Sequence, residues 1–355
     1  MREDRTIGRA TPARGARSAV GAGTGARGSG ESTPRGARGF RPRWDGRAGA
    51  WAELLRVSAL ATVPGDALAG AAALGARPHR GTLLALGSSL CLYEAGMALN
   101  DWADRAEDAR DRPHRPLPSG RIRPRAALAA STALTATGLA LAARAGRAPL
   151  AVAGALAATV WAYDLHLKHT RLGPATMAGA RALDLLLGAT ATATSARHTG
   201  PATRGAGLTA RRRGDTPVPG PVAWRRAATS AGLLGAHTYA VTMLSRHETQ
   251  GGATAAPVLA LAVTAGLAAA AGGGGGSPLA AVLAADYART PATPLLHAVL
   301  NPSPPLTQRA VGGGIRALVP LQATLAARSG APGTALALLA LAPLARALAR
   351  KVSPT

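Results

Sequence analysis

Hydrophobic and polar positions alternate in long blocks from about residue 51 onward. Apolar stretches of roughly 18 to 23 residues, long enough to cross the hydrocarbon core of a bilayer, are separated by short breaks rich in proline, glycine or charge. Gly272–Pro278 and Thr290–Pro305 are expected to be loops. The pattern predicts an all-α polytopic membrane protein with about nine spans in a bundle. The predicted spans are 53–75, 82–103, 124–144, 147–167, 172–192, 223–245, 256–274, 308–328 and 331–349.

The first 50 residues follow a different pattern. They are rich in Arg, Gly, Ala, Ser and Pro and contain no apolar core, so they do not resemble a secretory signal and are typical of a disordered basic tail. We therefore divide the chain into a tail, 1–50, and a membrane domain, 51–355. The tail is expected to stay in the cytosol, where its arginines can contact anionic membrane lipid.

Charge and cysteine content exclude several classes of protein. The chain has 41 Lys and Arg residues against 17 Asp and Glu, a formal net charge of +24, but the arginines are spread over the tail and the loops. A nucleic-acid-binding protein would combine a focused basic face with aromatic residues, and only 3% of this chain is aromatic. We expect no nucleic-acid partner. With Cys91 as the single cysteine, no disulfide can form within the chain.

The basic residues also predict an orientation. If the tail is cytosolic, the breaks after the second, fourth and sixth spans face the cytosol, and the first two of these breaks are rich in Arg and Lys, as the positive-inside rule requires. Arg211–Arg213, in the break 193–221, would then lie outside and does not follow the rule. We expect a multi-pass protein of the cell membrane with its active-site loops in the cytosol.

Acidic residues gather where the second span ends. Asp101, Asp104, Glu107 and Asp108 form a local reversal of charge in a strongly basic chain. Asn100, Asp104 and Asp108 follow one another at four-residue spacing, which places them on one stripe of a helix. Such oxygen ligands favour Mg²⁺ or Ca²⁺ over zinc, and Mg²⁺ commonly completes its shell with water and substrate phosphate. The alternative is an acidic helix end that simply faces water.

Ionisable residues also occur within or at the ends of the predicted spans. A charge in hydrocarbon is costly unless it faces a polar cavity, so together these residues predict such a cavity inside the bundle, open to the cytosolic side and to lipid. Arg181 and Asp184 lie three residues apart and are expected to pair with each other. The full set is Arg56, Asp66, Glu94, Asp164, Lys168, Arg181, Asp184, His237 and Glu248.

The acidic stripe and the turn after it are shared with a known family. Asn100, Asp101, Asp104 and Asp108 fill every position of the pattern NDxxDxxxD, and Arg115–Gly120 reads Arg-Pro-Leu-Pro-Ser-Gly. In these motifs the chain resembles the UbiA superfamily of intramembrane prenyltransferases, from about residue 51 to the end. The resemblance implies a bundle of nine helices.

Other positions extend the resemblance, and one departs from it. Tyr163 and Lys168, at the end of the fourth span, are similar to a family feature, and Arg56 is similar to the family's first-helix arginine. The family's second acidic motif is reduced to Glu248, because the position four residues earlier is Leu244. A complete second magnesium site is therefore not expected.

The resemblance implies transfer of an isoprenyl group from a polyprenyl (allylic) diphosphate to a small acceptor, aromatic or lipid-like. It implies Mg²⁺ as the cofactor, with Asn100, Asp104, Asp108 and Glu248 as metal ligands. Asp104, Asp108 and Lys168 are expected to carry catalysis. We expect Asn100, Asp104, Asp108, Lys168 and Glu248 to converge on one cavity at the cytosolic end of the bundle.

Substrate binding is assigned in the same way. Lys168, Arg115 and Arg112 are expected to bind the diphosphate, and Arg56 and Tyr163 complete the substrate-binding set. The incomplete second motif leaves an alternative open, a non-catalytic member that binds and presents or helps to export a prenyl lipid. The sequence also leaves open the length of the prenyl chain, the acceptor and the oligomeric state.

Overall fold

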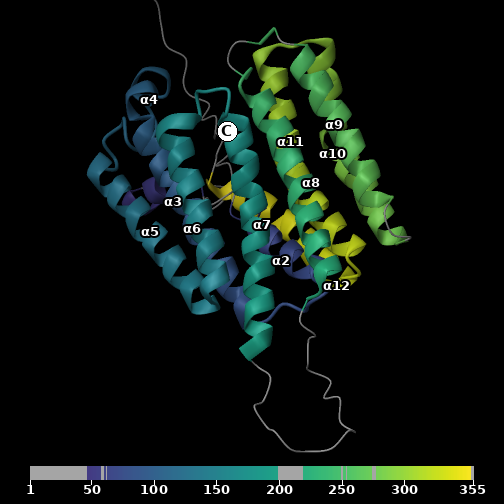
Figure 1. Ribbon diagram of the computed structural model, residues 1–355. Coiled ribbons are helices and arrows are strands. Elements are labelled where there is room, and N and C mark those ends of the chain that lie inside the picture. The colour runs from purple at the N-terminus through teal and green to yellow at the C-terminus, as the bar shows by residue number, and fades with distance from the viewer. Residues whose placement is uncertain are drawn as a thin grey trace, which may run out of the picture. The chain divides into compact units, whose positions relative to one another are not determined.

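The computed structural model describes residues 46–56, 60, 62–198, 219–248, 251–252, 254–273 and 277–352, all within one compact unit, Arg43–Thr355. Most of the predicted tail and the arginine cluster Arg211–Arg213 lie outside the described residues. Every secondary-structure element in the described part is a helix (Figure 1). The helices are α1(Arg47–Leu54), α2(Pro64–Ala73), α3(Arg80–Ala103), α4(Arg105–Asp111), α5(Pro124–Ala145), α6(Arg147–Ala162), the π-helix η2(Tyr163–Leu167), α7(Gly173–His198), α8(Pro221–Ser245), α9(Ala255–Gly272), α10(Pro278–Leu300), α11(Pro304–Arg328) and α12(Pro332–Val352).

Length and composition identify the helices that could cross a bilayer. Among the described residues, five helical segments are long and apolar enough for this. They are Arg80–Ala103, Pro124–Ala145, Arg147–Leu167, Ala255–Gly272 and Pro304–Arg328. The all-α prediction is therefore confirmed, and most of the predicted spans coincide with a long helix.

The first predicted span is different. Instead of one helix over 53–75, the chain forms α1 and, after a break, α2. Arg56, just after α1, has a backbone φ of 47°, in the left-handed region that ends a helix. Pro64 then begins α2, because a proline at the first helical position needs no backbone N–H and has a suitable fixed φ. The break brings Arg56 to the central cavity described below.

The structure also corrects the predicted loop Thr290–Pro305. Most of it belongs to α10, which continues through Pro291 and Pro294 to Leu300. A Cβ added to Gly313 of α11 would lie 3.3 Å from both Pro291 Cα and Pro294 Cγ, so the glycine gives α10 room to pack closely on α11. Prolines are tolerated inside membrane helices where neighbouring helices support the backbone, and for this reason proline content misled the sequence prediction.

Helices α2 and α7 cross at glycines. A Cβ at Gly188 would lie 2.3 Å from Ala67 Cα, and a Cβ at Gly70 would lie 2.1 Å from the carbonyl oxygen of Leu185. Such backbone-to-backbone contact is possible only without side chains, as in many helix pairs within membranes. The crossing fixes Asp66 of α2 beside Arg181 of α7.

Several connections lie at the same end of the bundle. Arg246, after α8, donates to the carbonyl of Thr170, before α7, at 2.6 Å, and Gly252 N donates to the carbonyl of Pro302 at 2.8 Å. Helix α4 lies beyond the end of α3 at this end (Figure 1). The candidate site is built from these connections.

Candidate functional site

The acidic stripe does not lie on one continuous helix. Helix α3 ends at Ala103 and α4 begins at Arg105, with Asp104 between them at φ −85° and ψ 2°. Hydrogen bonds still run from Asp104 N to Asn100 O (2.9 Å) and from Asp108 N to Asp104 O (2.8 Å). The non-helical ψ at Asp104 turns the chain, so the predicted single stripe is wrong in detail. Asn100 and Asp104 are half-buried, whereas Asp108 is buried.

Arginines hold the two most buried carboxylates of this region. Arg115 Nη1 lies 2.9 Å from Asp108 Oδ2 and 3.4 Å from Asp101 Oδ1. Arg56 adds a contact of 3.3 Å to Asp101, and Arg112 one of 3.8 Å to Asp108. Buried carboxylates need such partners. The turn that contains Arg115 is thus folded back onto the end of α3, and Asp108 supports the site through Arg115.

The π-helix η2 brings a second group of residues to the end of α3. Lys168 N donates to Tyr163 O at 2.9 Å, the wider hydrogen bond that defines a π-turn, and such turns are frequent at functional sites. The Lys168 ammonium forms a salt bridge with Asp104. Asn100 Nδ2 donates to Asp164 Oδ1 at 3.1 Å. The end of α3 and the η2 segment therefore form one polar junction, although Asp104 and Lys168 are 64 residues apart in the sequence.

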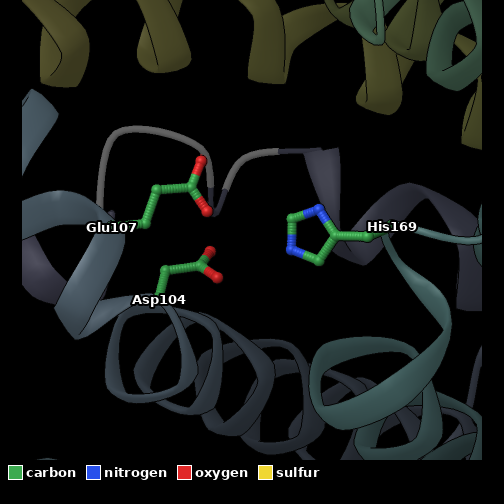
Figure 2. A group of neighbouring side chains, drawn as sticks. All are labelled: Asp104, Glu107 and His169. Atoms are coloured by element: carbon green, nitrogen blue, oxygen red, sulfur yellow. The ribbon is translucent and has the colours of Figure 1, made fainter.

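A cavity of about 410 Å³ lies at this junction, and its lining includes Asp104, Glu107, Asp164, Lys168 and His169. The ligand atoms of Asp104, Glu107 and His169 lie within 4.8 Å of one another, and Figure 2 shows the three side chains pointing toward one another. We refer to this space as the ion cavity. Sequence reasoning did not select Glu107 or His169 as ligands, although Glu107 is part of the acidic cluster and His169 follows Lys168.

A larger cavity of about 550 Å³ lies inside the bundle, and we refer to it as the central cavity. Its wall is mainly apolar, with Leu92, Met97, Leu156, Val160 and Leu318 among its residues. The predicted site residues that line it are Arg56, Asn100, Tyr163 and Glu248, and it is also lined by Asp164.

The predicted site residues are therefore divided between two adjoining cavities. Asn100 and Glu248 line the central cavity, and Asp104 and Lys168 line the ion cavity. Asp164 lines both, so it forms part of the wall between them. Asp108 lines neither of these two cavities and contacts Arg112 and Arg115 instead.

Glu248 lies in the turn after α8, outside the membrane-spanning helices, and lines the central cavity. Burial raises the pKa of its carboxyl above the usual range, and the positive charge of Arg112 acts in the opposite direction. The charge of Arg112 thus reaches both Asp108 and Glu248, which come from separate acidic motifs of the sequence.

Deeper polar residues pair differently from the prediction. Arg181 Nη1 donates to Asp66 Oδ2 at 2.7 Å, and Asp184 Oδ2 accepts from Ser89 Oγ at 2.7 Å. The expected partner of Arg181 was Asp184, three residues along the same helix. The α2–α7 crossing brings Asp66 to Arg181 instead, a contact between helices that sequence spacing does not reveal.

The residues at the junction fit a bound Mg²⁺. Asp104 and Glu107 supply carboxylate oxygens close to one another, and Asn100 and Asp164 supply further oxygens nearby. Mg²⁺ usually takes one or two carboxylates and keeps positions for water and phosphate oxygens. Lys168 next to these acids provides a cation for an anionic ligand of the metal.

Comparison with known proteins identifies the family. The model of the UbiA prenyltransferase family matches residues 59–301. The chain belongs to the UbiA prenyltransferase family, as the acidic motif, the Arg-Pro-Leu-Pro-Ser-Gly turn and the all-helical fold together lead one to expect.

Curated relatives match over shorter stretches. The chain is 35% identical over 116 residues to a digeranylgeranylglyceryl phosphate synthase of Methanopyrus kandleri, a match that covers 33% of this chain and 41% of the relative. It is 35% identical over 150 residues to the protein of the same name from Ignicoccus hospitalis, covering 42% of this chain and 49% of the relative. The matched stretch thus spans less than half the length of these relatives.

Solved structures share the fold. A UbiA homologue from Aeropyrum pernix K1, solved in the apo form, is similar with a TM-score of 0.55 and 17% identity, covering 75% of this chain and 96% of the other. A UbiA homologue from Archaeoglobus fulgidus, solved with DMAPP and Mg²⁺ bound, gives a TM-score of 0.50 and 16% identity, covering 76% and 98%. The similarity extends over nearly all of the two solved structures and about three quarters of this chain.

Proposed function

We propose that this protein is a Mg²⁺-dependent prenyltransferase that moves an isoprenyl group from an allylic diphosphate to an acceptor within the membrane. The observation that carries the proposal is the junction at Asp164, where an ion cavity with carboxylates and Lys168 adjoins a mainly apolar cavity of about 550 Å³. This arrangement suits a substrate with a diphosphate head and an apolar tail. The donor bound by the Archaeoglobus fulgidus homologue, DMAPP, is of this class.

The diphosphate would be held at the ion cavity. Asp104 and Glu107, with Asp164 beside them, would hold Mg²⁺ there, and Asn100 and Glu248 line the adjoining central cavity. When bound, Mg²⁺ neutralises negative charge on the diphosphate and acts as a Lewis acid toward its oxygens. Lys168 would bind a further diphosphate oxygen by exchanging part of its contact with Asp104.

Residues around the junction would orient the substrate. Arg115 and Asp108 fix the turn next to Asp104, and Arg112 adds positive charge at its edge. Arg56 and Tyr163 line the central cavity beside Asn100, where the allylic carbon would lie. Geometry of this kind lowers the barrier because the reacting groups are already positioned.

In the transfer itself, the bond between the allylic carbon and the diphosphate oxygen breaks, and the diphosphate leaves with both electrons. The acceptor then supplies the electron pair for the new bond and loses a proton. The apolar wall of the central cavity, including Leu92, Val160 and Leu318, excludes the water that would capture the allylic cation. The reaction yields a prenylated acceptor and diphosphate.

The relatives also guide the choice of test substrates. Those described above are named digeranylgeranylglyceryl phosphate synthases, which supports including a prenylated glyceryl phosphate among the acceptors. We further propose that the protein resides in the cell membrane with the ion cavity at the cytosolic face. Loop charge supports this orientation.

The test uses full-length protein in lipid nanodiscs with Mg²⁺, labelled donors from dimethylallyl to geranylgeranyl diphosphate, and a panel of acceptors. We expect release of diphosphate and a labelled product in the wild type, and a loss of about 100-fold or more in kcat/KM for Asp104→Asn. Asp111→Asn, an exposed acid at the end of α4, is the matched control and should keep wild-type rates.

Two outcomes would count against the enzyme. Tight binding of donors without turnover on any acceptor would favour the non-catalytic lipid carrier. Equal activity in Asp104→Asn and the wild type would remove Asp104 from the mechanism.

A further inference from the structure

Arginines gather at the end of the bundle opposite the ion cavity. Arg80 begins α3, and the ion cavity lies at the other end of that helix, about 36 Å away. Further arginines follow α2, lie where α5 ends and α6 begins, and occupy the second turn of α8. The proposed transfer gives them no role. We refer to this group as the arginine rim, which consists of Arg77, Arg80, Arg144, Arg147, Arg225 and Arg226.

Packing around the end of α7 brings the segments of the arginine rim together. Thr82 of α3 shares a hydrogen bond of 2.9 Å with Thr192 of α7. A Cβ at Gly146, between α5 and α6, would lie 2.6 Å from Thr194 Cγ2. The end of α2 and the start of α8 pack on the same turns of α7, in a buried cluster that includes Ala73, Ala189, Ala193, Ala223 and Ala227.

The pairing of α3 with α5 sets the level of three of the arginines. Ser88 Oγ of α3 donates to the carbonyl of Gly138 of α5 at 2.8 Å, and the two helices run antiparallel. About two turns closer to the rim, they reach Arg80 and the connection that holds Arg144 and Arg147. These three side chains therefore begin at one level of the bundle, on neighbouring helices.

The rim arginines lack acidic partners. No Asp or Glu lies within two helical turns of any of them along the sequence, and all of their side chains are exposed. In the described part of the chain, none of them forms an ion pair. The ion-cavity end differs, because its cations contact carboxylates, as do Arg56, Arg112, Arg115, Arg121 and Lys168. The positive charge of the rim is thus left uncompensated.

The arginine rim lies at the depth expected for lipid headgroups. Three helical segments that are long and apolar enough to cross a bilayer begin or end there, namely Arg80–Ala103, Pro124–Ala145 and Arg147–Leu167. Leu83 and Leu150 are 64% and 38% exposed and lie one turn deeper, on the same helix faces as Arg80 and Arg147. A guanidinium above an exposed leucine suits a ligand with a charged head and apolar chains.

Membrane orientation does not account for this charge. With the ion cavity at the cytosolic face, as proposed above, the rim faces the outer side, where the positive-inside rule predicts few basic residues in short connections. At headgroup depth the available anions are the phosphate groups of lipids. Arginine suits phosphate, because its planar fork can donate two parallel hydrogen bonds.

We propose that the arginine rim binds an anionic phospholipid, with the lipid phosphate between Arg80, Arg144 and Arg147 and the acyl chains along Leu83 and Leu150. A zwitterionic lipid carries its own cation, so the rim selects a lipid with net negative charge, such as phosphatidylglycerol. Bound lipid also relieves the repulsion among the guanidiniums and thereby stabilises this end of the bundle.

The experiment titrates the full-length protein in a neutral detergent with phosphatidylglycerol or phosphatidylcholine, and measures bound lipid by native mass spectrometry and the thermal midpoint. We expect phosphatidylglycerol to bind at least about tenfold more tightly and to raise the thermal midpoint more. Arg144→Gln combined with Arg147→Gln should weaken phosphatidylglycerol about tenfold and leave phosphatidylcholine unchanged. No prenyl substrate is used, so the outcome is independent of the proposed function.

Arg123→Gln combined with Arg125→Gln is the matched control. It removes two exposed arginines from the other end of α5, where the acids of the motif accompany the basic residues. The affinity for phosphatidylglycerol should then change less than about twofold. Arg80→Gln, on a different helix from the first pair, should reproduce part of the loss and provides a second test of the rim.

Three results overturn the proposal. Equal affinity for the two lipids would show that the rim does not select charge. Equal losses in the two double variants would show that any pair of exposed arginines contributes, and that no site exists at the rim. Displacement of bound phosphatidylglycerol by an equal concentration of inorganic phosphate would assign the rim to a water-soluble anion.

Discussion

Arg115 shows how one side chain supports the candidate site without lining either cavity. It bridges Asp101 at the end of α3 and Asp108 in α4, the two buried acids of the acidic motif. The Arg-Pro-Leu-Pro-Ser-Gly turn, noticed first as a family motif, therefore has a physical role. It returns the chain so that one guanidinium reaches two carboxylates.

Replacing Arg115 tests this role. In Arg115→Met, Asp101 keeps its contact of 3.3 Å from Arg56, whereas Asp108 keeps only the longer contact of 3.8 Å from Arg112. We expect a loss of about 1–3 kcal/mol of stability, because a partly buried carboxylate is left short of positive charge. Thermal unfolding followed by tryptophan fluorescence measures it. Arg125→Met, an exposed arginine on α5, should change stability by less than about 0.5 kcal/mol, and an equal loss there would contradict the bridging role.

Glu248 gives a prediction that depends on pH. Burial raises the pKa of Glu248, so the folded protein binds this proton more tightly than the unfolded chain does. Ionising Glu248 therefore costs stability as the pH rises above the ordinary glutamate pKa of about 4.3. Glu248→Gln should unfold at a higher temperature than the wild type at pH 7.5, and the gap should close below about pH 4. A gap of the opposite sign at pH 7.5 would show that the ionised form is stabilised.

At the scale of the elements, the crossing of α2 and α7 positions Arg181 in the wall of the central cavity. The absence of a side chain at Gly188 lets the α7 backbone touch α2 at Ala67. That contact sets the distance between Asp66, which precedes Ala67 on α2, and Arg181, about two turns before Gly188 on α7. The small residues at the crossing of α2 and α7 thus determine how Asp66 and Arg181 pair.

Gly188→Ala is the corresponding test. The new Cβ would lie 2.3 Å from Ala67 Cα, so the two backbones must separate, at a cost of about 2 kcal/mol or more. Gly179→Ala is the control on the same helix, because a Cβ there meets nothing within 4 Å, and it should be neutral or slightly stabilising. Equal thermal midpoints for the two variants, measured in the same detergent, would rule out a tight crossing.

The elements also show what the sequence could and could not predict. Long apolar runs identified α3, α5, α6 with η2, α9 and α11, because hydrocarbon demands length and apolar composition. The helix through Pro291 and Pro294 was missed, since support from α11 is invisible in a local pattern. The family resemblance located Asp104 and Lys168, but only the fold shows Asp104 at a helix break and Glu107 and His169 beside it. Pairing across helices, such as Asp66 with Arg181, depends on packing and left no periodic signal.

At the scale of the whole molecule, the connections that build the candidate site all lie at one end of the bundle. Helix α5 runs away from this end, and α6 returns toward it. His114, before α5, and Arg147, at the start of α6, should therefore face opposite sides of the membrane. Helix α5 alone rises about 33 Å between them, enough to span the hydrocarbon core.

Cysteine labelling checks this arrangement. In a Cys91→Ser background, His114→Cys should react with a membrane-impermeant maleimide in inverted vesicles, and Arg147→Cys in intact cells. Both side chains are exposed, so access is set by the membrane. Reaction of both from the same side would show that α5 does not span, and a complete reversal would put the ion cavity outside the cell.

The shared wall at Asp164 has a consequence for how the proposed reaction ends. The two products differ in solubility: diphosphate belongs in water, and the prenylated acceptor belongs in lipid. Because the ion cavity and the central cavity adjoin at Asp164, each product is left on its own side once the carbon–oxygen bond is broken. Release is then two independent departures, and a long product that is slow to enter the bilayer need not keep the diphosphate from leaving.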